Sequence, residues 1–225
     1  MAYRFMKPLE MPRGTHYGNN YWIFYSVKLG RRVTAFSNLE YENLITLEMN
    51  PEVEYYCEQP TKIILFDKDE DKTAIPDVWV LYRDGREEFQ EVKYAESLLE
   101  GNPDYMRSME QIEREKSWCE MNGFDFSIKT YESVHIGEYY LRNLIFLRGH
   151  LKSNLLSNNS TFRKLFNAIK YDSTIGSLIN DETITEKNMM TMLSCMFYKG
   201  LITFDDFDDK PLRLETRVRL NEENI

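Results

Sequence analysis

The chain has 225 residues, of which 42% are hydrophobic and 14% aromatic, and its 28 Lys and Arg against 37 Asp and Glu give a formal net charge of −9. This composition is typical of a folded globular protein with one large domain or two smaller ones, and it excludes disordered, collagen-like and coiled-coil chains. Proteins that bind nucleic acid through their whole surface are usually basic, so the acidic charge disfavours that class. An enzyme that recruits cations, or a protein that partners deliver to DNA, fits the charge.

Cysteine and histidine give no framework for a disulfide or a zinc site. The cysteines are odd in number and isolated, and the histidines are scattered: Cys57, Cys119, Cys195, His16, His135 and His150. No apolar run approaches the length that spans a bilayer, and the first residues lack the apolar region of a signal peptide. We therefore expect a cytoplasmic protein without a membrane partner.

Residues 1–150 predict an α/β domain. A loop is expected at 8–20 and a charged turn at 67–72, because of their Pro, Gly, Asn and charged residues. Hydrophobic periodicity predicts strands at 21–29, 32–36, 53–58, 62–66, 77–82, 88–94 and 124–129. Helices are expected at 37–49, 104–121 and 139–151, and Ser37 with Glu40 fits a capping box at the start of the first.

The pattern changes after a polar joint at 152–160, which predicts a second domain at 151–225. Three helices (161–171, 173–180 and a methionine-rich one at 185–199) precede two strands (201–204 and 212–220) around an acidic turn. Three helices followed by a hairpin indicate a winged-helix domain. The first 150 residues carry a net charge of −8 and the remainder −1.

The chemistry is concentrated in Ile75-Pro76-Asp77 and in Glu91-Val92-Lys93. A proline and an acid at a strand start, followed by Glu-x-Lys on the next strand, is the PD-(D/E)XK nuclease pattern. Alternate residues of a strand share a face, so Glu91 and Lys93 point the same way and Val92 turns into the core.

The register of the hairpin decides whether Asp77 joins them. A two-residue loop, Asp84-Gly85, would place Val78 opposite Glu91 and turn Asp77 away. A three-residue loop, 83–85, with Gly85 in a left-handed conformation, would place Asp77 opposite Glu91. Glycine is the residue that such a loop prefers at its last position, so we predict the three-residue form.

Two facing carboxylates suit a hard cation such as Mg²⁺, which takes oxygen ligands and lowers the pKa of bound water. Lys93 would orient the attacking water or neutralise charge on the phosphate. Glu40, one turn into the first helix, is the candidate for a further acid, although its local role is the capping box. The expected catalytic residues are thus Glu40, Asp77, Glu91 and Lys93.

Each element of this pattern also has a plain structural interpretation. A lone Glu-x-Lys on a strand is usually a solvated ion pair, and Pro-Asp is a common turn. The methionine-rich helix is more often core than a ligand surface. The nuclease interpretation depends on the combination of motifs and their order.

The sequence at this point resembles the TnsA-type endonuclease subunit of heteromeric DNA transposases, a Tn7-like family. The residues that carry the resemblance are the segments 36–40 (FSNLE), 51–53 (PEV), 58–60 (EQP), 75–77 (IPD), 91–93 (EVK) and 140–144 (YLRNL). The likeness covers about residues 30–150 in motif and the rest only in pattern.

The resemblance implies a restriction-endonuclease-like domain followed by a winged helix. It implies DNA cleavage at the 5′ ends of a transposon, on the strand that is not transferred, with a TnsB-like DDE transposase acting on the 3′ ends. A TnsC-like ATPase regulator would contact the C-terminal region. Two Mg²⁺ ions, which Mn²⁺ could replace, would be held by Glu40, Asp77, Glu91 and Val92. The best-known members have Gln at the position of Glu91, a difference that should favour metal binding.

The predicted C-terminal domain is a poor candidate for reading DNA. A DNA-reading winged helix has a basic recognition helix and wing. Here the third helix offers Lys187 and Lys199, whereas the turn of the wing carries Asp205, Asp206, Asp208 and Asp209. These acids would repel phosphate, so we expect this domain to contact protein.

Two other functions stay open. A restriction, repair or phage-associated nuclease of the same fold would cleave DNA without a transposase. A non-catalytic adaptor would keep the nuclease fold as a scaffold, although packing several acids at one site lowers stability unless a cation offsets their repulsion.

Overall fold

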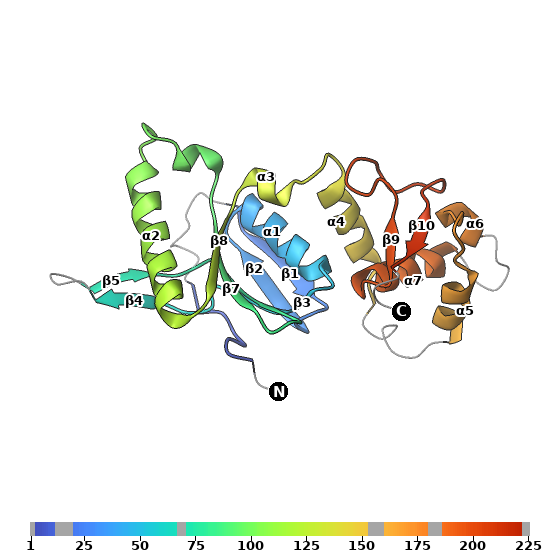
Figure 1. Cartoon of the computed structure of the whole chain (residues 1–225), viewed down its shortest axis with the longest axis horizontal. Coiled ribbons are helices and arrows are strands. Elements are labelled where there is room, and N and C mark those ends of the chain that lie inside the picture. Colours follow the sequence, from blue (N-terminus) through green and yellow to red (C-terminus); the bar gives the residue numbers. More distant parts are fainter. Residues whose placement is uncertain (1–2, 12–19, 67–70, 153–159, 180–185, 222–225) are drawn as a thin grey trace. The chain divides into compact units, whose positions relative to one another are not determined.

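The computed structural model describes residues 3–11, 20–66, 71–152, 160–179 and 186–221 (Figure 1). The chain divides into two compact units, one made of residues up to 48 with 52–134, and one made of 49–51 with 135–225. Parts of the expected loop at 8–20, the charged turn at 67–72 and the joint at 152–160, and the expected helix start at Thr185, lie outside the described residues. None of the described helices is long and apolar enough to cross a membrane.

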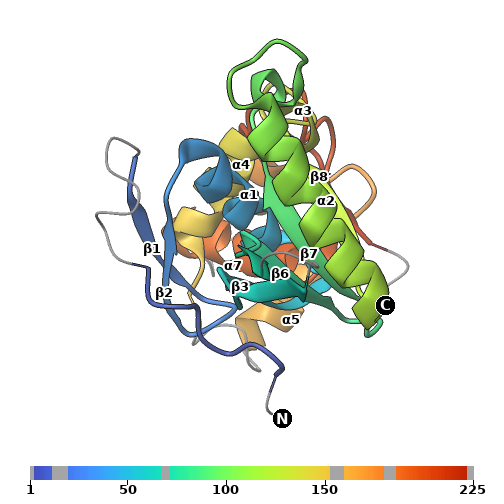
Figure 2. The same cartoon turned by 90° about the vertical axis from the view of Figure 1, so that its left-hand side faces the viewer.

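A four-stranded mixed sheet forms the centre of the first unit. Its order is β3 (Val53–Glu58), β6 (Val78–Tyr82), β7 (Glu87–Val92) and β8 (Asp125–Lys129). The first three strands pair antiparallel, and β8 runs parallel to β7. Helices α1 (Asn38–Met49) and α2 (Tyr105–Asn122) cover opposite faces, as Figure 2 shows. The neighbouring residues Gln90 and Glu91 point to opposite faces, so one bonds to α1 and the other to α2.

Among its described residues, the first unit also has two short hairpins and two short helices. The hairpins are β1 (Trp22–Ser26) with β2 (Arg31–Ala35), and β4 (Ile63–Phe66) with β5 (Asp71–Ala74). The 3₁₀ helix η2 (Ala95–Leu98) and helix α3 (Tyr131–Val134) were not expected from the sequence, nor was β5. The predicted strand at 21–29 is too long, because the chain turns after Ser26 and Gly30 N–H bonds to the Ser26 carbonyl.

The face of the sheet that carries α2 packs an aromatic core. Trp79 and Phe89 are buried there with Cys119 of α2. The N-terminal segment also lies on this face, where Tyr3 stacks on Tyr55 and Phe5 contacts both Trp79 and Phe89 edge-on. Sequence periodicity gave no sign of this segment's place, because a segment without regular structure has no period to read.

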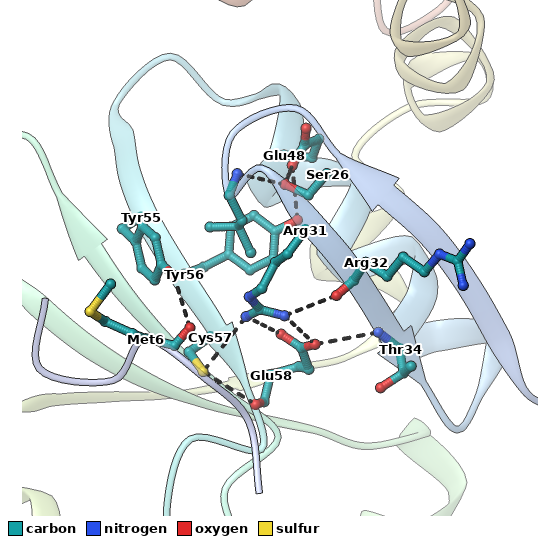
Figure 3. A network of polar contacts seen from close by, with 11 residues as sticks. Met6, Ser26, Arg31, Arg32, Thr34, Glu48, Tyr55, Tyr56, Cys57 and Glu58 are labelled. Atoms are coloured by element: carbon teal, nitrogen blue, oxygen red, sulfur yellow. Dashed lines mark hydrogen bonds and ion pairs between the residues drawn. The ribbon is translucent and has the colours of Figure 1, made fainter. Parts of the chain in front are cut away.

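Glu48 joins three elements of the first unit through one buried carboxylate (Figure 3). Its oxygens accept hydrogen bonds from Ser26 Oγ at 2.5 Å, Tyr56 Oη at 2.9 Å and the backbone N–H groups of Val27 and Lys28 at 2.8 and 3.1 Å. The carboxylate therefore ties the β1–β2 turn and strand β3 to the last turn of α1.

A second buried acid, Glu58 at the end of β3, holds the other strand of that hairpin (Figure 3). Arg31 donates two hydrogen bonds of 2.7 Å to its carboxylate, and the N–H of Thr34 lies 3.4 Å from one oxygen. The bidentate pair fixes β2 against β3, which places the chain for its entry into α1.

The described part of the second unit contains four helices and a short hairpin. They are α4 (Tyr140–His150), α5 (Ser160–Ala168), α6 (Ile175–Ile179), α7 (Glu186–Tyr198), β9 (Ile202–Phe204) and β10 (Val218–Leu220). The isolated bridge between Thr174 and Arg217 adds a short extension to the hairpin. The strand expected at 212–220 spans only Val218–Leu220 in the structure. The Thr216 N–H donates a hydrogen bond to the Arg213 carbonyl, which makes a turn before the strand.

Helix α4 lies with the second unit because it packs on α7. The division between the compact units therefore falls at 134/135, before the 150/151 boundary expected from the polar joint. The polar segment 152–160 marks a change in the sequence pattern. The division between the compact units depends instead on helix α4, whose apolar face packs on α7.

We predict that Glu48→Ala lowers the free energy of unfolding by about 3 kcal/mol or more, since four donors lose a buried charged acceptor. Urea unfolding followed by circular dichroism measures this. The control is Glu120→Ala, which removes an exposed carboxylate 4.0 Å from Lys116 and should cost less than about 1 kcal/mol. Equal effects of the two substitutions would contradict the role given to Glu48.

Candidate active site

The β6–β7 hairpin has the predicted three-residue loop. Gly85 N–H bonds to the Tyr82 carbonyl at 3.0 Å, and Tyr82 N–H bonds to the Arg86 carbonyl at 2.9 Å. Gly85 has φ of +90°, a conformation that side chains disfavour. The paired residues run from Leu81 opposite Glu87 to Val78 opposite Gln90. Continued by one residue, this register sets Asp77 opposite Glu91, so the predicted register is confirmed.

Asp77 is fixed to the strand that carries the other site residues. Its Oδ2 accepts a 2.7 Å hydrogen bond from the backbone N–H of Val92. The Val92 side chain is buried with Leu39 and Val134, as the alternation along the strand predicts. Asp77 thus crosses from the start of β6 to the end of β7, where Glu91 and Lys93 lie.

Lys93 is held by an ion pair and a hydrogen bond. Its Nζ lies 2.7 Å from Glu91 Oε1 and donates to Gln111 Oε1 at 3.1 Å. The amide nitrogen of Gln111 donates to the same oxygen of Glu91 at 2.7 Å and to Glu115 Oε1 at 2.9 Å. Gln111 and Glu115 are one turn apart on α2, so this helix closes the side of the site.

Glu91 and Glu115 are buried carboxylates that each keep one oxygen, Oε2, without a hydrogen bond. Burial, with the nearby Glu115 charge, raises the pKa of Glu91 to about 8, although Lys93 opposes the shift. Burial likewise raises the pKa of Glu115 to about 7. The site therefore holds more acid than its single lysine balances, which favours a bound proton or cation.

Glu40, the predicted fourth site residue, acts on Asp77 through its negative charge. Burial raises the pKa of Asp77 well above its usual range, and the charges of Glu91 and then Glu40 add to the effect. Glu40 also has the local role expected of it, since its N–H bonds to Ser37 Oγ at 3.1 Å and its Oε2 accepts the Phe36 N–H at 3.0 Å. The capping contact holds the carboxylate at the start of α1.

The donor chemistry of the site fits a hard cation, because oxygen atoms of Asp77 and Glu91 gather at the end of the sheet and Glu91 Oε2 has no partner. Their present arrangement is not a metal site: within the described residues, no group of three or more His, Cys, Asp or Glu side chains is placed to hold an ion. Glu91 instead bonds to Lys93 and Gln111.

Gln111 and Glu115 were missed by the sequence analysis. They belong to helix α2, which has polar or charged residues on most of its surface. The sequence pattern therefore does not indicate which face of this helix packs on the sheet. The available signal was the spacing of four residues between a Gln and a Glu that follow a Glu-x-Lys strand, because such a pair lies on one helix face. That spacing becomes informative only once the phase of α2 over β7 is known.

The mixed sheet, with two acids and a lysine at one end, fits a restriction-endonuclease-like α/β fold. Residues 50–131 match the family model described as TnsA-like endonuclease N terminal. This match bears out the resemblance inferred from the sequence and supports a DNA endonuclease of Tn7-like transposition. The matched segment includes Asp77, Glu91 and Lys93 but not Glu40. No curated protein matches the chain.

We predict that the protein without divalent cations loses stability as the pH rises towards 8. The native state keeps a proton on Glu91 that the unfolded chain releases near 4.5, so the free energy of unfolding falls between these values, by up to about 1.4 kcal/mol per pH unit. Glu91→Gln removes this contribution and should reduce the slope between about pH 6 and pH 8, where the raised pKa of Glu115 still contributes. Urea unfolding in EDTA measures it, and parallel curves for the two proteins would refute the assignment.

Gln111→Ala should lower the free energy of unfolding at pH 8 by about 1–3 kcal/mol, because it removes the hydrogen-bond donor shared by two buried carboxylates. The matched control is Glu113→Ala, which changes an exposed residue of the same helix and should have an effect below about 0.5 kcal/mol. The comparison uses the same urea experiment. A Gln111 effect no larger than the control would show that the amide does not support the carboxylates.

Proposed function

We propose that this protein is the metal-dependent endonuclease subunit that cleaves the 5′ ends of a transposon, on the strand that is not transferred. The observation that carries the proposal is the register of the β6–β7 hairpin, which brings Asp77 beside Glu91 and Lys93. The family match to residues 50–131 supports the same class of reaction.

In this proposal each site residue has a separate task. Asp77 and Glu91, with the backbone carbonyl of Val92 and the carboxylate of Glu40, supply the oxygen ligands of Mg²⁺. The ion, when bound, polarises the phosphodiester and lowers the pKa of a water molecule. Lys93 exchanges its contact with Glu91 for one with the phosphate or the attacking water, since a compact ammonium suits both.

Gln111 is placed to keep Lys93 oriented if Glu91 gives up its contact with the lysine to serve as a metal ligand. Its Oε1 accepts from Lys93 at 3.1 Å, and its nitrogen also bonds to Glu115. Because the two contacts of the amide with Lys93 and Glu115 do not involve Glu91, they can persist when Glu91 is withdrawn. The lysine then stays at the end of the sheet, where the substrate must lie.

We further propose that the protein acts with a TnsB-like transposase, which would cut the 3′ ends, and with a TnsC-like ATPase that contacts the C-terminal unit. The net charge of −9 fits an enzyme that partners bring to DNA. The order α5, α6, α7, β9, β10, with the Thr174–Arg217 bridge, supports a winged-helix architecture for residues 160–220.

The metal proposal is tested first by calorimetry of Mn²⁺ binding, with and without duplex DNA. We expect binding by the wild type, loss of binding in Asp77→Ala, and no change in Asp84→Ala, which alters an exposed aspartate of the adjacent loop. Equal binding by wild type and Asp77→Ala would reject the metal site.

Cleavage of transposon-end DNA, assayed with candidate transposase partners, tests the roles. Asp77→Ala and Lys93→Ala should each lower the cleavage rate by at least about 100-fold, which corresponds to several kcal/mol of transition-state stabilisation. Lys93→Ala should keep Mn²⁺ binding, because the lysine is not a ligand. Wild-type cleavage rates in either variant would contradict the assignment.

A further inference from the structure

The acidic turn that follows β9 is less acidic than its sequence indicates. Asp205 accepts two hydrogen bonds from Arg219, at 2.5 and 2.8 Å, and Asp206 pairs with Lys210 at 2.7 Å. Arg219 also lies over the ring of Tyr171 at 5.2 Å. Two of the four aspartates are therefore neutralised, one by Arg219 of β10 and one by Lys210 of the loop itself.

The same turn is firmly attached to α4. The buried Asn143 donates to the carbonyls of Phe207 and Lys210 at 2.6 and 2.8 Å, and accepts the Leu212 N–H at 3.1 Å. A Cβ atom on Gly137 would lie 2.4 Å from the carbonyl oxygen of Asp208, so glycine is needed for this close approach. Phe207 stacks on neighbouring aromatic rings.

The following residues are attached to α6. Gly176 N–H bonds to the Leu214 carbonyl at 2.7 Å, and Ile175 N–H bonds to the Thr216 carbonyl at 3.0 Å. The loop between β9 and β10 is thus held at both ends by backbone contacts. Such a loop presents its side chains without a large cost of ordering them on binding.

Between Met189 and Met196, helix α7, which stands where a winged helix has its recognition helix, offers little surface to a DNA groove. Seven of its residues are buried: Met189, Thr191, Met192, Leu193, Ser194, Cys195 and Met196. They cover all sides of the helix, which packs against α4, α6 and β9. A binding surface of this unit is therefore sought outside residues 189–196.

The loop borders a cavity of about 640 Å³ that holds two unpaired guanidinium groups. Within the described part of the chain, the side chains of Arg213 and Arg217 make no hydrogen bond or ion pair, and both are exposed. The lining acids Asp205 and Asp206 already have partners, which leaves Glu215 as the unpaired acid of the lining. The lining itself carries three acids and three bases, but Arg219, from outside it, pairs with Asp205 and Lys210 pairs with Asp206, so two arginines face one unpaired acid.

We propose that this cavity binds an acidic segment of a partner protein through Arg213 and Arg217, the two lining cations that have no acidic side chain bonded to them. Guanidinium groups pair with carboxylates through two parallel hydrogen bonds, and two of them beside one cavity suit a segment with more than one acid. Leu214, which is 54% exposed beside them, adds an apolar contact. The inference rests on the proposed function only in requiring a protein partner for the C-terminal unit.

A peptide fits this site better than duplex DNA. The cavity has the size of sites that enclose small ligands or side chains, whereas a duplex is a broad convex surface that cannot enter it. Successive phosphates along a duplex would also meet Glu215 and the unpaired Asp208 and Asp209 of the same loop. A short acidic segment in the cavity faces Glu215 as well, but it stays clear of Asp208 and Asp209, which are not part of the lining.

The test is fluorescence anisotropy with the full chain and a labelled short peptide of alternating Glu and Leu. We expect binding that weakens with salt and falls by at least about tenfold in Arg213→Gln/Arg217→Gln, because two charge-assisted contacts are lost. The matched control is Arg163→Gln/Lys164→Gln, two exposed cations of α5, which should bind like the wild type. Thermal unfolding of each variant checks that the fold is kept.

Three outcomes would overturn the proposal: no binding of the acidic peptide by the wild type, equal losses in both double variants, or binding of a labelled DNA duplex in place of the peptide with the same dependence on Arg213 and Arg217. Asp77→Ala, assayed in parallel, should bind the peptide like the wild type. Failure of the nuclease proposal would therefore appear in Mn²⁺ binding, and failure of this one in peptide binding.

Discussion

The three-residue turn between β6 and β7 is the constraint on which the site depends. Gly85 accepts a positive φ that other residues resist, and this sets the pairing of the two strands. A change of one residue would reverse which side chains of β6 face α2. Asp77 would then leave Glu91, and its hydrogen bond to Val92 N–H could not form. The chemistry at one end of the sheet is thus fixed by backbone geometry at the other end of the hairpin.

The site combines charges that oppose one another in the absence of a ligand. Glu91 and Glu115 are buried, share one amide donor, and have raised pKa values. Glu40 and Asp77 add further acid nearby, while Lys93 provides one positive charge. Such an arrangement lowers the stability of the folded state and raises its affinity for whatever brings positive charge. A site that serves only as scaffold would gain from losing these acids.

Local rules were enough for part of this picture. The loop preference of glycine gave the register, strand alternation gave the inward Val92 and the shared face of Glu91 and Lys93, and the Ser37–Glu40 spacing gave the cap of α1. Local rules could not predict how elements that are distant in the sequence pack against one another. Gln111 reaches Glu91 only because of the phase of α2, and α4 belongs with α7 because of where its apolar face is buried. Likewise, the charge count of the β9–β10 loop could not reveal that Asp205 is paired with Arg219.

The hydrogen bond between Asn43 Nδ2 and Gln90 Oε1, at 2.9 Å, has a consequence for how this domain tolerates insertions and deletions. Asn43 follows Glu40 by one helical turn, and Gln90 precedes Glu91 directly, so the bond locks the two halves of the site at fixed chain lengths. Adding or removing a residue between Glu40 and Asn43, or between Asp77 and Gln90, would misalign the acids even if the fold survived. Length variation among such domains should therefore collect in segments outside these two intervals, such as the connection from η2 to α2.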